Sequence, residues 1–329
     1  AEAGPVALVI DDLHWADPSS VNVLQGVVTL LDDVPLLLVL GTRDEPDSPG
    51  WDLVRTARDR LGAALLEIRL APLDRDGSST LVGNLLEIES LPADTRERIL
   101  ERAEGNPLFV EEVIRMLVER EAIERRGDRW VATGASADID IPDTVHGLIL
   151  SRIDRLPEEA RRVLRVASCI ERTFAVTLLE AVLAEAGEEM QVRAALGRLE
   201  GAGLLVLAST LPELEYRFGH ALIAEGAYQT MLRQERREWH RRVADVLLRR
   251  NPERESELAG QLATHYERAG DAEAATRYLL MAARQVMMRN SMVEAGALLA
   301  RAATQVERLP EPESESGCRL RFDVISGRL

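Results

Sequence analysis

VALVIDDLHWAD, residues 6–17, is the stretch around which the rest of the chain is organised. Its first five residues are β-branched or aliphatic without a polar interruption, which predicts a strand of a parallel sheet that is buried on both faces. Asp11 and Asp12 follow where that strand must leave the sheet. In phosphoryl-transfer proteins, an acid at this point holds the water shell of a magnesium ion, and an adjacent acid polarises the attacking water. The two acids would equally serve to cap the next segment, and this stretch alone leaves both interpretations open.

Helices and strands are predicted to alternate through the first 73 residues. The pattern predicts a helix over residues 18–31 with Asp17 as its N-cap, a strand over 36–40, a helix over 51–61 and a strand over 65–70. Such alternation indicates a parallel sheet with crossover helices, in which ligands bind at the carboxyl ends of the strands. Arg43 comes soon after the second of these strands, so it is expected at the same edge as Asp11 and Asp12.

From Asp74 onward the apolar residues recur mostly at helical spacing. Helices are predicted over residues 78–88, 93–104, 107–121, 143–156, 157–169, 175–186 and 189–202, with a hairpin or a linker over 125–133. Two strand-like runs, 204–207 and 214–218, then flank Pro212, and helices closed by a β-hairpin are typical of a winged helix. The remainder is predicted to be helical, with an irregular tetratricopeptide-like repeat between residues 262 and 302.

Composition limits the classes to which this protein can belong. A chain of 329 residues with 46% hydrophobic content indicates a multidomain, soluble protein. Its net charge of −16 argues against nucleic acid or an anionic membrane as the main partner. The longest apolar run, residues 34–40, is too short to span a bilayer, and the protein is predicted to be cytoplasmic.

Other kinds of site find little support in the sequence. Cys169 and Cys318 have no paired spacing, the five histidines form no HExxH motif, and no GxSxG elbow occurs. The chain contains no lysine, which excludes a mechanism that needs an amine from this chain. Residues 233–250 are rich in arginine but also contain acids, so they predict a solvated, salt-bridged helix face over the alternative of a docking site for an acidic partner.

Taken together, these features resemble the STAND class of AAA-like ATPases, in particular bacterial ATPase modules found behind adenylate cyclase domains or in front of LuxR-type DNA-binding domains. The resemblance spans nearly the whole chain. Residues 8–17 are similar to a Walker B segment, residues 41–43 to a sensor-arginine segment, and residues 105–109, GNPLF, to a GxP-type motif. Residues 217–222 with Tyr228 look like the passage from a winged helix to helical repeats.

The resemblance implies ATP and Mg²⁺ as cofactors and assigns roles to five residues. Asp11 would hold Mg²⁺ through its water shell, and Asp12 would activate the attacking water, slowly because it is shorter than the usual glutamate. Arg43 would sense the γ-phosphate. Asn106 and Pro107 would belong to the nucleotide site, with Pro107 against the adenine. Two alternatives stay open: Arg43 as a surface residue paired with Asp44 or Glu45, and Pro107 as a proline that merely opens a helix.

The chain departs from this family in one respect. The phosphate-binding loop G-x-x-x-x-G-K-[ST] is absent, and it would precede the Walker B segment. We therefore interpret the chain as a fragment cut before that segment and again within its C-terminal repeats. The expected domains are the C-terminal part of a P-loop NTPase core (1–73), a helical lid (74–135), a winged-helix domain (136–225) and a repeat region (226–329).

The expected function is a regulatory one. In the complete protein, nucleotide state would switch an effector domain such as a cyclase or a DNA-binding domain, while the repeats bind a protein partner or inducer. One alternative is a transcription regulator that binds DNA through its winged helix, although Glu189 and Glu200 beside Arg193 and Arg198 match phosphate poorly. Another is a helical adaptor with a vestigial nucleotide site. The chain as it stands is expected to be inactive as an ATPase.

Overall fold

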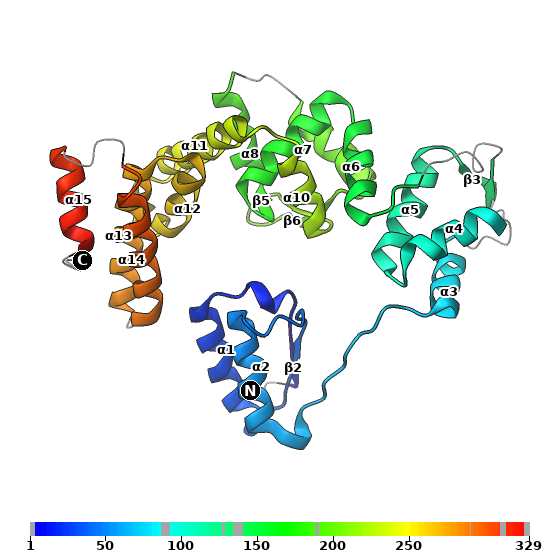
Figure 1. The fold of residues 1–329 in the computed structure, drawn as a ribbon, viewed down its shortest axis with the longest axis horizontal. Coiled ribbons are helices and arrows are strands. Elements are labelled where there is room, and N and C mark those ends of the chain that lie inside the picture. The colour runs from blue at the N-terminus through cyan, green and yellow to red at the C-terminus, as the bar shows by residue number, and fades with distance from the viewer. Residues whose placement is uncertain are drawn as a thin grey trace. The chain divides into compact units, whose positions relative to one another are not determined.

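The computed structural model describes residues 4–86, 93–126, 129–133, 141–187, 191–289, 291–309 and 314–325. Within these residues the chain is mainly helical, with small sheets (Figure 1). Its contacts divide it into two compact units. The first unit consists of residues 1–69, 253–267 and 271–329, and the second of residues 70–252 and 268–270.

The first unit begins with a parallel strand pair and two helices. Its elements are β1 (Val6–Ile10), α1 (Pro18–Leu30), β2 (Leu36–Leu40) and α2 (Pro49–Leu61). The two strands pair in parallel, residue for residue, and α1 and α2 pack against each other (Figure 1). The carboxylate of Asp17 caps α1 by accepting a hydrogen bond from the Ser20 amide at 2.9 Å, and Pro18 is the first helical residue. The predicted strand–helix–strand–helix order is confirmed.

Two expectations about this sheet are wrong. Burial on both faces was expected, but Val9, Leu37 and Val39 are 68%, 61% and 43% exposed, while Leu38 and Leu40 on the alternate face pack into the core. The predicted strand over 65–70 does not form, and its Leu66, Ile68 and Leu70 are also exposed. A parallel strand needs a neighbour for its backbone hydrogen bonds, and in the described part of this unit the sheet consists of β1 and β2. Leu37 and Val39 are exposed because the core cluster packs against the opposite face of β2, which carries Leu38 and Leu40.

The second unit starts with three helices and a hairpin. These are α3 (Arg75–Leu86), α4 (Ala93–Ala103), α5 (Pro107–Glu119), β3 (Ile123–Arg126) and β4 (Arg129–Ala132). The predicted helices are present where they are described, the predicted end of the first falling at residues 87–88, outside the described residues. Of the two possibilities for residues 125–133, the structure forms the hairpin. Apolar residues at helical spacing on α5 build the centre of the core, with Phe109, Val110, Val113 and Leu117 all buried.

The second unit continues with further helices and a small antiparallel sheet. They are α6 (Val145–Arg155), α7 (Glu158–Ile170), β5 (Thr173–Ala175), α8 (Val176–Glu185), α9 (Val192–Gly201), β6 (Leu205–Ser209), β7 (Glu215–Phe218), α10 (Ala221–Gln229) and α11 (Arg233–Arg250). The predicted hairpin is present as β6 and β7. The sequence did not predict β5, which adds a third strand in the order β5-β7-β6. We refer to α6 through α10 as the helix–hairpin region.

The C-terminal helices belong to the first unit apart from residues 268–270. They are α12 (Ala259–Ala269), α13 (Ala272–Met288), α14 (Met292–Val306) and α15 (Glu315–Ile325). Small buried residues, Ala275, Ala282 and Ala302, allow close packing, and the rings of Tyr266 and Tyr278 stack at 5.4 Å. The prediction of a helical tail is confirmed for the described residues. Among all the helices that the structure describes, none combines the length and the apolar character needed to cross a membrane.

Candidate functional site

Asp11 and Asp12 lie where β1 leaves the sheet, as the sequence predicted. The chain turns there into a short 3₁₀ helix, η1 (Leu13–Trp15). Asp12 makes this turn in the left-handed conformation, with φ 56° and ψ 36°, and its amide donates a hydrogen bond to Oδ1 of Asp11 at 2.9 Å. A residue other than glycine in this conformation is uncommon, although aspartate tolerates it better than most, and such residues cluster at functional sites.

Gly41 brings the two strand ends together. Its amide donates to the carbonyl of Ile10 at 2.8 Å, and its own carbonyl accepts from the amide of Leu13 at 2.9 Å. A Cβ atom at position 41 would lie 2.5 Å from Oδ1 of Asp11. Glycine therefore leaves the space that the Asp11 carboxylate occupies, and the edge carrying Asp11 and Asp12 adjoins the segment that leads to Arg43.

Arg43 contacts an aromatic ring and a carboxylate. Its guanidinium lies 5.8 Å from the ring centroid of Trp15, and Nη1 lies 3.9 Å from a carboxylate oxygen of Glu45. Both side chains of the ion pair are about half exposed, at 56% and 50%, so the pair contributes only about 0–1 kcal/mol. The pairing matches the alternative interpretation of Arg43 as a surface residue. It holds the side chain too weakly to prevent contact with an anion.

His14 is the residue of this site that the sequence did not single out. Its side chain is buried, and neither ring nitrogen has a hydrogen-bond partner among the described groups. The ring contacts Trp15, with 4.6 Å between the ring centroids. An unpaired buried nitrogen costs about 1–3 kcal/mol, so the described part of the chain has an unused hydrogen-bonding group two residues after Asp12. Periodicity gives no signal for such a residue, because burial next to a strand end suits an apolar side chain equally well.

Asn106 and Pro107 belong to the second unit. The side-chain oxygen of Asn106 accepts a hydrogen bond from the Leu108 amide at 3.0 Å, and Pro107 is the first residue of α5. Both residues are exposed. This is the geometry of a capped helix with a proline at its first position, so the alternative interpretation of Pro107 is met without any ligand. The start of α5 also presents the helix end that favours anions.

The side chains present fit part of a Mg-nucleotide site. Carboxylate oxygens such as those of Asp11 are the ligands that Mg²⁺ prefers, and the guanidinium of Arg43 suits a phosphate. The described residues contain no group of three or more metal-binding side chains, so a metal ion would take its other ligands from water or phosphate. Neither a lysine nor a phosphate-binding loop occurs in the chain to neutralise a triphosphate.

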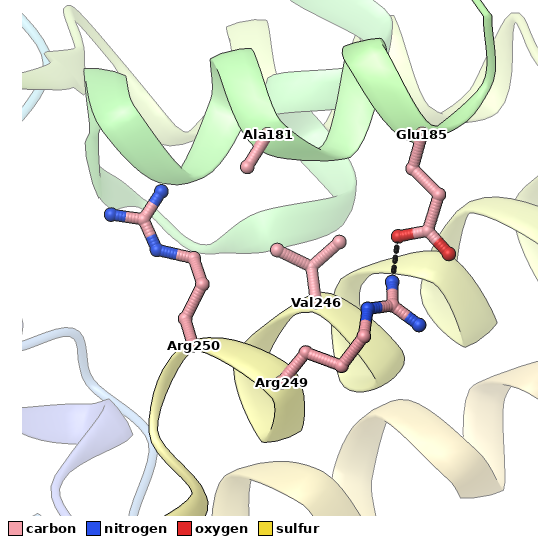
Figure 2. Close-up of a pocket in the computed structure, with 5 residues that line it drawn as sticks. All are labelled: Ala181, Glu185, Val246, Arg249 and Arg250. Atoms are coloured by element: carbon pink, nitrogen blue, oxygen red, sulfur yellow. Dashed lines mark hydrogen bonds and ion pairs between the residues drawn. The ribbon is translucent and has the colours of Figure 1, made fainter.

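A pocket of about 350 Å³ lies elsewhere, between α8 and α11 of the second unit (Figure 2). It is lined by Ala181, Glu185, Val246, Arg249 and Arg250. Arg249 pairs with Glu185 across the pocket, and Arg250 donates to the carbonyl of Thr177 at 2.6 Å. Both guanidinium groups are engaged within the unit, and none of the predicted nucleotide-site residues lines the pocket.

The arginine-rich helix α11 makes similar internal contacts. Arg236 donates to the carbonyl of Met231, and Arg242 lies over the ring of the buried Trp239. Glu235 accepts from Arg162 at 2.7 Å. These contacts favour the predicted salt-bridged face over a docking site for an acidic partner.

Part of the chain matches a family model, and nearly all of it matches a curated relative. Residues 74–129 match a family described as a domain of unknown function, DUF8739. Over 322 residues the chain is 27% identical to an uncharacterized protein of Rhizobium meliloti (strain 1021), covering 96% of this chain and 29% of that protein. The chain therefore spans less than a third of the length of this relative.

Two solved structures are also similar. One is a Signal Transduction ATPase with Numerous Domains (STAND) protein with a tetratricopeptide repeat sensor from Pyrococcus horikoshii, with 12% identity, 98% of this chain and 52% of that chain covered, and a TM-score of 0.47. The other is the ORC1 protein of Aeropyrum pernix in complex with DNA, with 14% identity, 69% and 65% covered, and a TM-score of 0.30.

Proposed function

We propose that this chain is part of a regulatory ATPase of the STAND class, and that residues 4–73 supply the magnesium and γ-phosphate edge of its nucleotide site. The observation that carries the proposal is the meeting of two strand ends. Asp11 and Asp12 follow β1, Arg43 follows β2, and the glycine at position 41 lets the Asp11 carboxylate lie against the second strand end. In parallel sheets this edge is where ligands bind.

Each side chain has a distinct task in this proposal. Asp11 would hold Mg²⁺, which would screen the phosphate charges. Asp12, whose backbone is left-handed where the chain leaves β1, accepts a hydrogen bond from the attacking water and orients it. Arg43 binds the γ-phosphate, and Asn106 and Pro107 at the start of α5 contact the nucleotide from the helical lid.

The remaining regions carry the regulation in this proposal. The lid comprises residues 74–135, the winged-helix domain residues 136–225, and the repeat region residues 226–329. Nucleotide state changes the arrangement of core, lid and winged helix, and the repeats bind a protein partner or inducer. The effector that is switched, for example a cyclase or a DNA-binding domain, lies in the longer protein to which a chain of this kind belongs.

The proposal is tested in a longer protein that joins this chain to a phosphate-binding loop. Asp12→Asn should leave the dissociation constant for ATP unchanged within about twofold and slow phosphate release roughly tenfold or more, because the lost charge acts on the water and not on the purine. Single-turnover release of inorganic phosphate gives the rate, and calorimetry gives the affinity.

Asp33→Asn is the matched control, since Asp33 is an exposed acid before β2, at the opposite end of the strand from Arg43. Its rate should equal that of the parent. Equal rates for the Asp12 variant and the parent would remove Asp12 from the mechanism.

Direct DNA binding by the winged helix is the second candidate, and the contacts of α9 argue against it. Glu200 accepts a hydrogen bond from the Tyr216 hydroxyl at 3.0 Å, and Arg193 pairs with Glu180 at 3.2 Å, so charged groups on this helix are engaged internally. Glu189 lies outside the described residues. We expect residues 1–329 to show no salt-sensitive binding to duplex DNA. A micromolar complex in a gel-shift assay, weakening steeply with salt, would contradict this.

A further inference from the structure

A group of buried charges joins α5 to the helix–hairpin region of the second unit. Arg152 of α6 is 1% exposed in its side chain, and Glu112 of α5 is 6% exposed. The guanidinium of Arg152 donates to Glu112 and to the carbonyl of Ala202, which follows α9, and its Nε donates to Glu119 at 3.0 Å. We call these four groups the Arg152 cluster. One arginine thus binds the middle of α5, the end of α5 and the end of α9.

The two carboxylates of the cluster stabilise the charged form of Arg152. Burial alone would lower the pKa of Arg152, but Glu112 and Glu119 outweigh it and the pKa lies above its ordinary value. Removing Arg152 alone would leave the buried carboxylate of Glu112 without the guanidinium that donates to it, whereas removing all of the charges together would leave no such carboxylate. The contacts of the cluster are therefore coupled to one another.

A second contact at the same junction involves Arg115 and Gly203. Gly203 has a left-handed backbone with φ 67°, and a Cβ atom there would collide with the guanidinium of Arg115. Arg115 also lies 4.0 Å from Glu112. The turn after α9 therefore lies against the end of the Arg115 side chain, which comes from the same helix as Glu112 and Glu119.

We propose that the Arg152 cluster fixes α5 and the helix–hairpin region in a single orientation, so that α5 transmits a displacement at its Asn106–Pro107 end to α6 and α9. Arg152 is a positioning residue in this device, because it acts through Glu112, Glu119 and the carbonyl of Ala202. The transmission from nucleotide rests on the proposed function, whereas the fixed orientation does not. The orientation can be measured on the chain as it stands, without nucleotide, so that its failure is distinguishable from a failure of the proposed function.

Spin labels measure the orientation directly. The labels are placed at Glu101→Cys on α4 and Ala184→Cys on α8, both exposed positions, in a Cys318→Ser background. Cys169 is buried, which raises its pKa to about 12, and it stays unlabelled. Pulsed electron paramagnetic resonance should give one narrow distribution of the distance between the two labels in the parent. Arg152→Met should broaden it at least twofold, and hydrogen exchange of the α5 amides should accelerate roughly tenfold or more relative to those of α7.

Arg155→Met is the matched control, because Arg155 is an exposed arginine on the same helix. It should reproduce the narrow distribution of the parent. If Arg152→Met does not fold, the triple variant Glu112→Gln, Glu119→Gln, Arg152→Met replaces it, since it leaves no buried charge unpaired. This variant should fold and show the broad distribution. A narrow distribution in a folded variant that lacks the ion pairs would overturn the proposal, because apolar packing alone would then fix the orientation.

Discussion

Titration of residues 1–329 with Mg-ATP should give no binding isotherm in the micromolar range and no phosphate release above background. A triphosphate needs its charge compensated, and in P-loop proteins most of that comes from loop amides, a lysine and the helix that follows the loop. The chain contains neither a lysine nor this loop motif. Asp11 and Asp12 repel the phosphates unless Mg²⁺ screens them, and Arg43 supplies one opposing charge. We expect a dissociation constant of about 1 mM or weaker, roughly three orders of magnitude above that of a complete site.

Arg43→Ala provides the control for this experiment. If the parent chain gives flat heats, the variant should give the same flat heats. A dissociation constant in the micromolar range or tighter for the parent would show that another part of the chain holds the phosphates. The edge formed by Asp11, Asp12 and Arg43 would then not be the whole phosphate site. Loss of binding in the Arg43 variant would show that this edge takes part in it.

Local chemistry explains which elements the sequence predicts correctly. Helix α1 has an aspartate cap followed by proline, and α5 has an asparagine cap followed by proline and an apolar stripe. Such signals act within a few residues, so they are readable without knowing the rest of the fold. The meeting of Asp11 with the Gly41 segment is also predictable, because parallel strands end at the same edge.

Features that depend on distant neighbours are not predictable in this way. Residues 65–70 have the apolar content of a strand, but a strand also needs a partner, which the sequence pattern cannot supply. The buried Arg152 looks from its sequence like any arginine near the end of an amphipathic helix, and its carboxylate partners lie 33 and 40 residues away. His14 likewise has an unpaired environment that only the three-dimensional contacts reveal.

Gly105→Ala should be among the most destabilising single substitutions in the second unit. Gly105 has φ 78°, a conformation that costs other residues about 1–2 kcal/mol. A Cβ atom there would lie 2.9 Å from both the amide nitrogen of Leu73 and Cβ of Pro72, and it would collide with the Leu73 carbonyl. The hydrogen bond from the Leu73 amide to the Gly105 carbonyl, at 2.8 Å, would then be strained or lost. With an overpacking cost of about 1–3 kcal/mol, we expect a total loss of roughly 3 kcal/mol.

Urea denaturation followed by far-ultraviolet circular dichroism measures this loss, and in a thermal scan the midpoint should fall by roughly 6–12 °C. Gly83→Ala is the matched control: Gly83 lies within α3, and nothing lies within 4 Å of a Cβ atom there. Because alanine favours a helix over glycine by about 1 kcal/mol, this variant should be as stable as the parent or more so. If Gly105→Ala unfolded with the parent's midpoint, the backbone would not require a glycine at position 105.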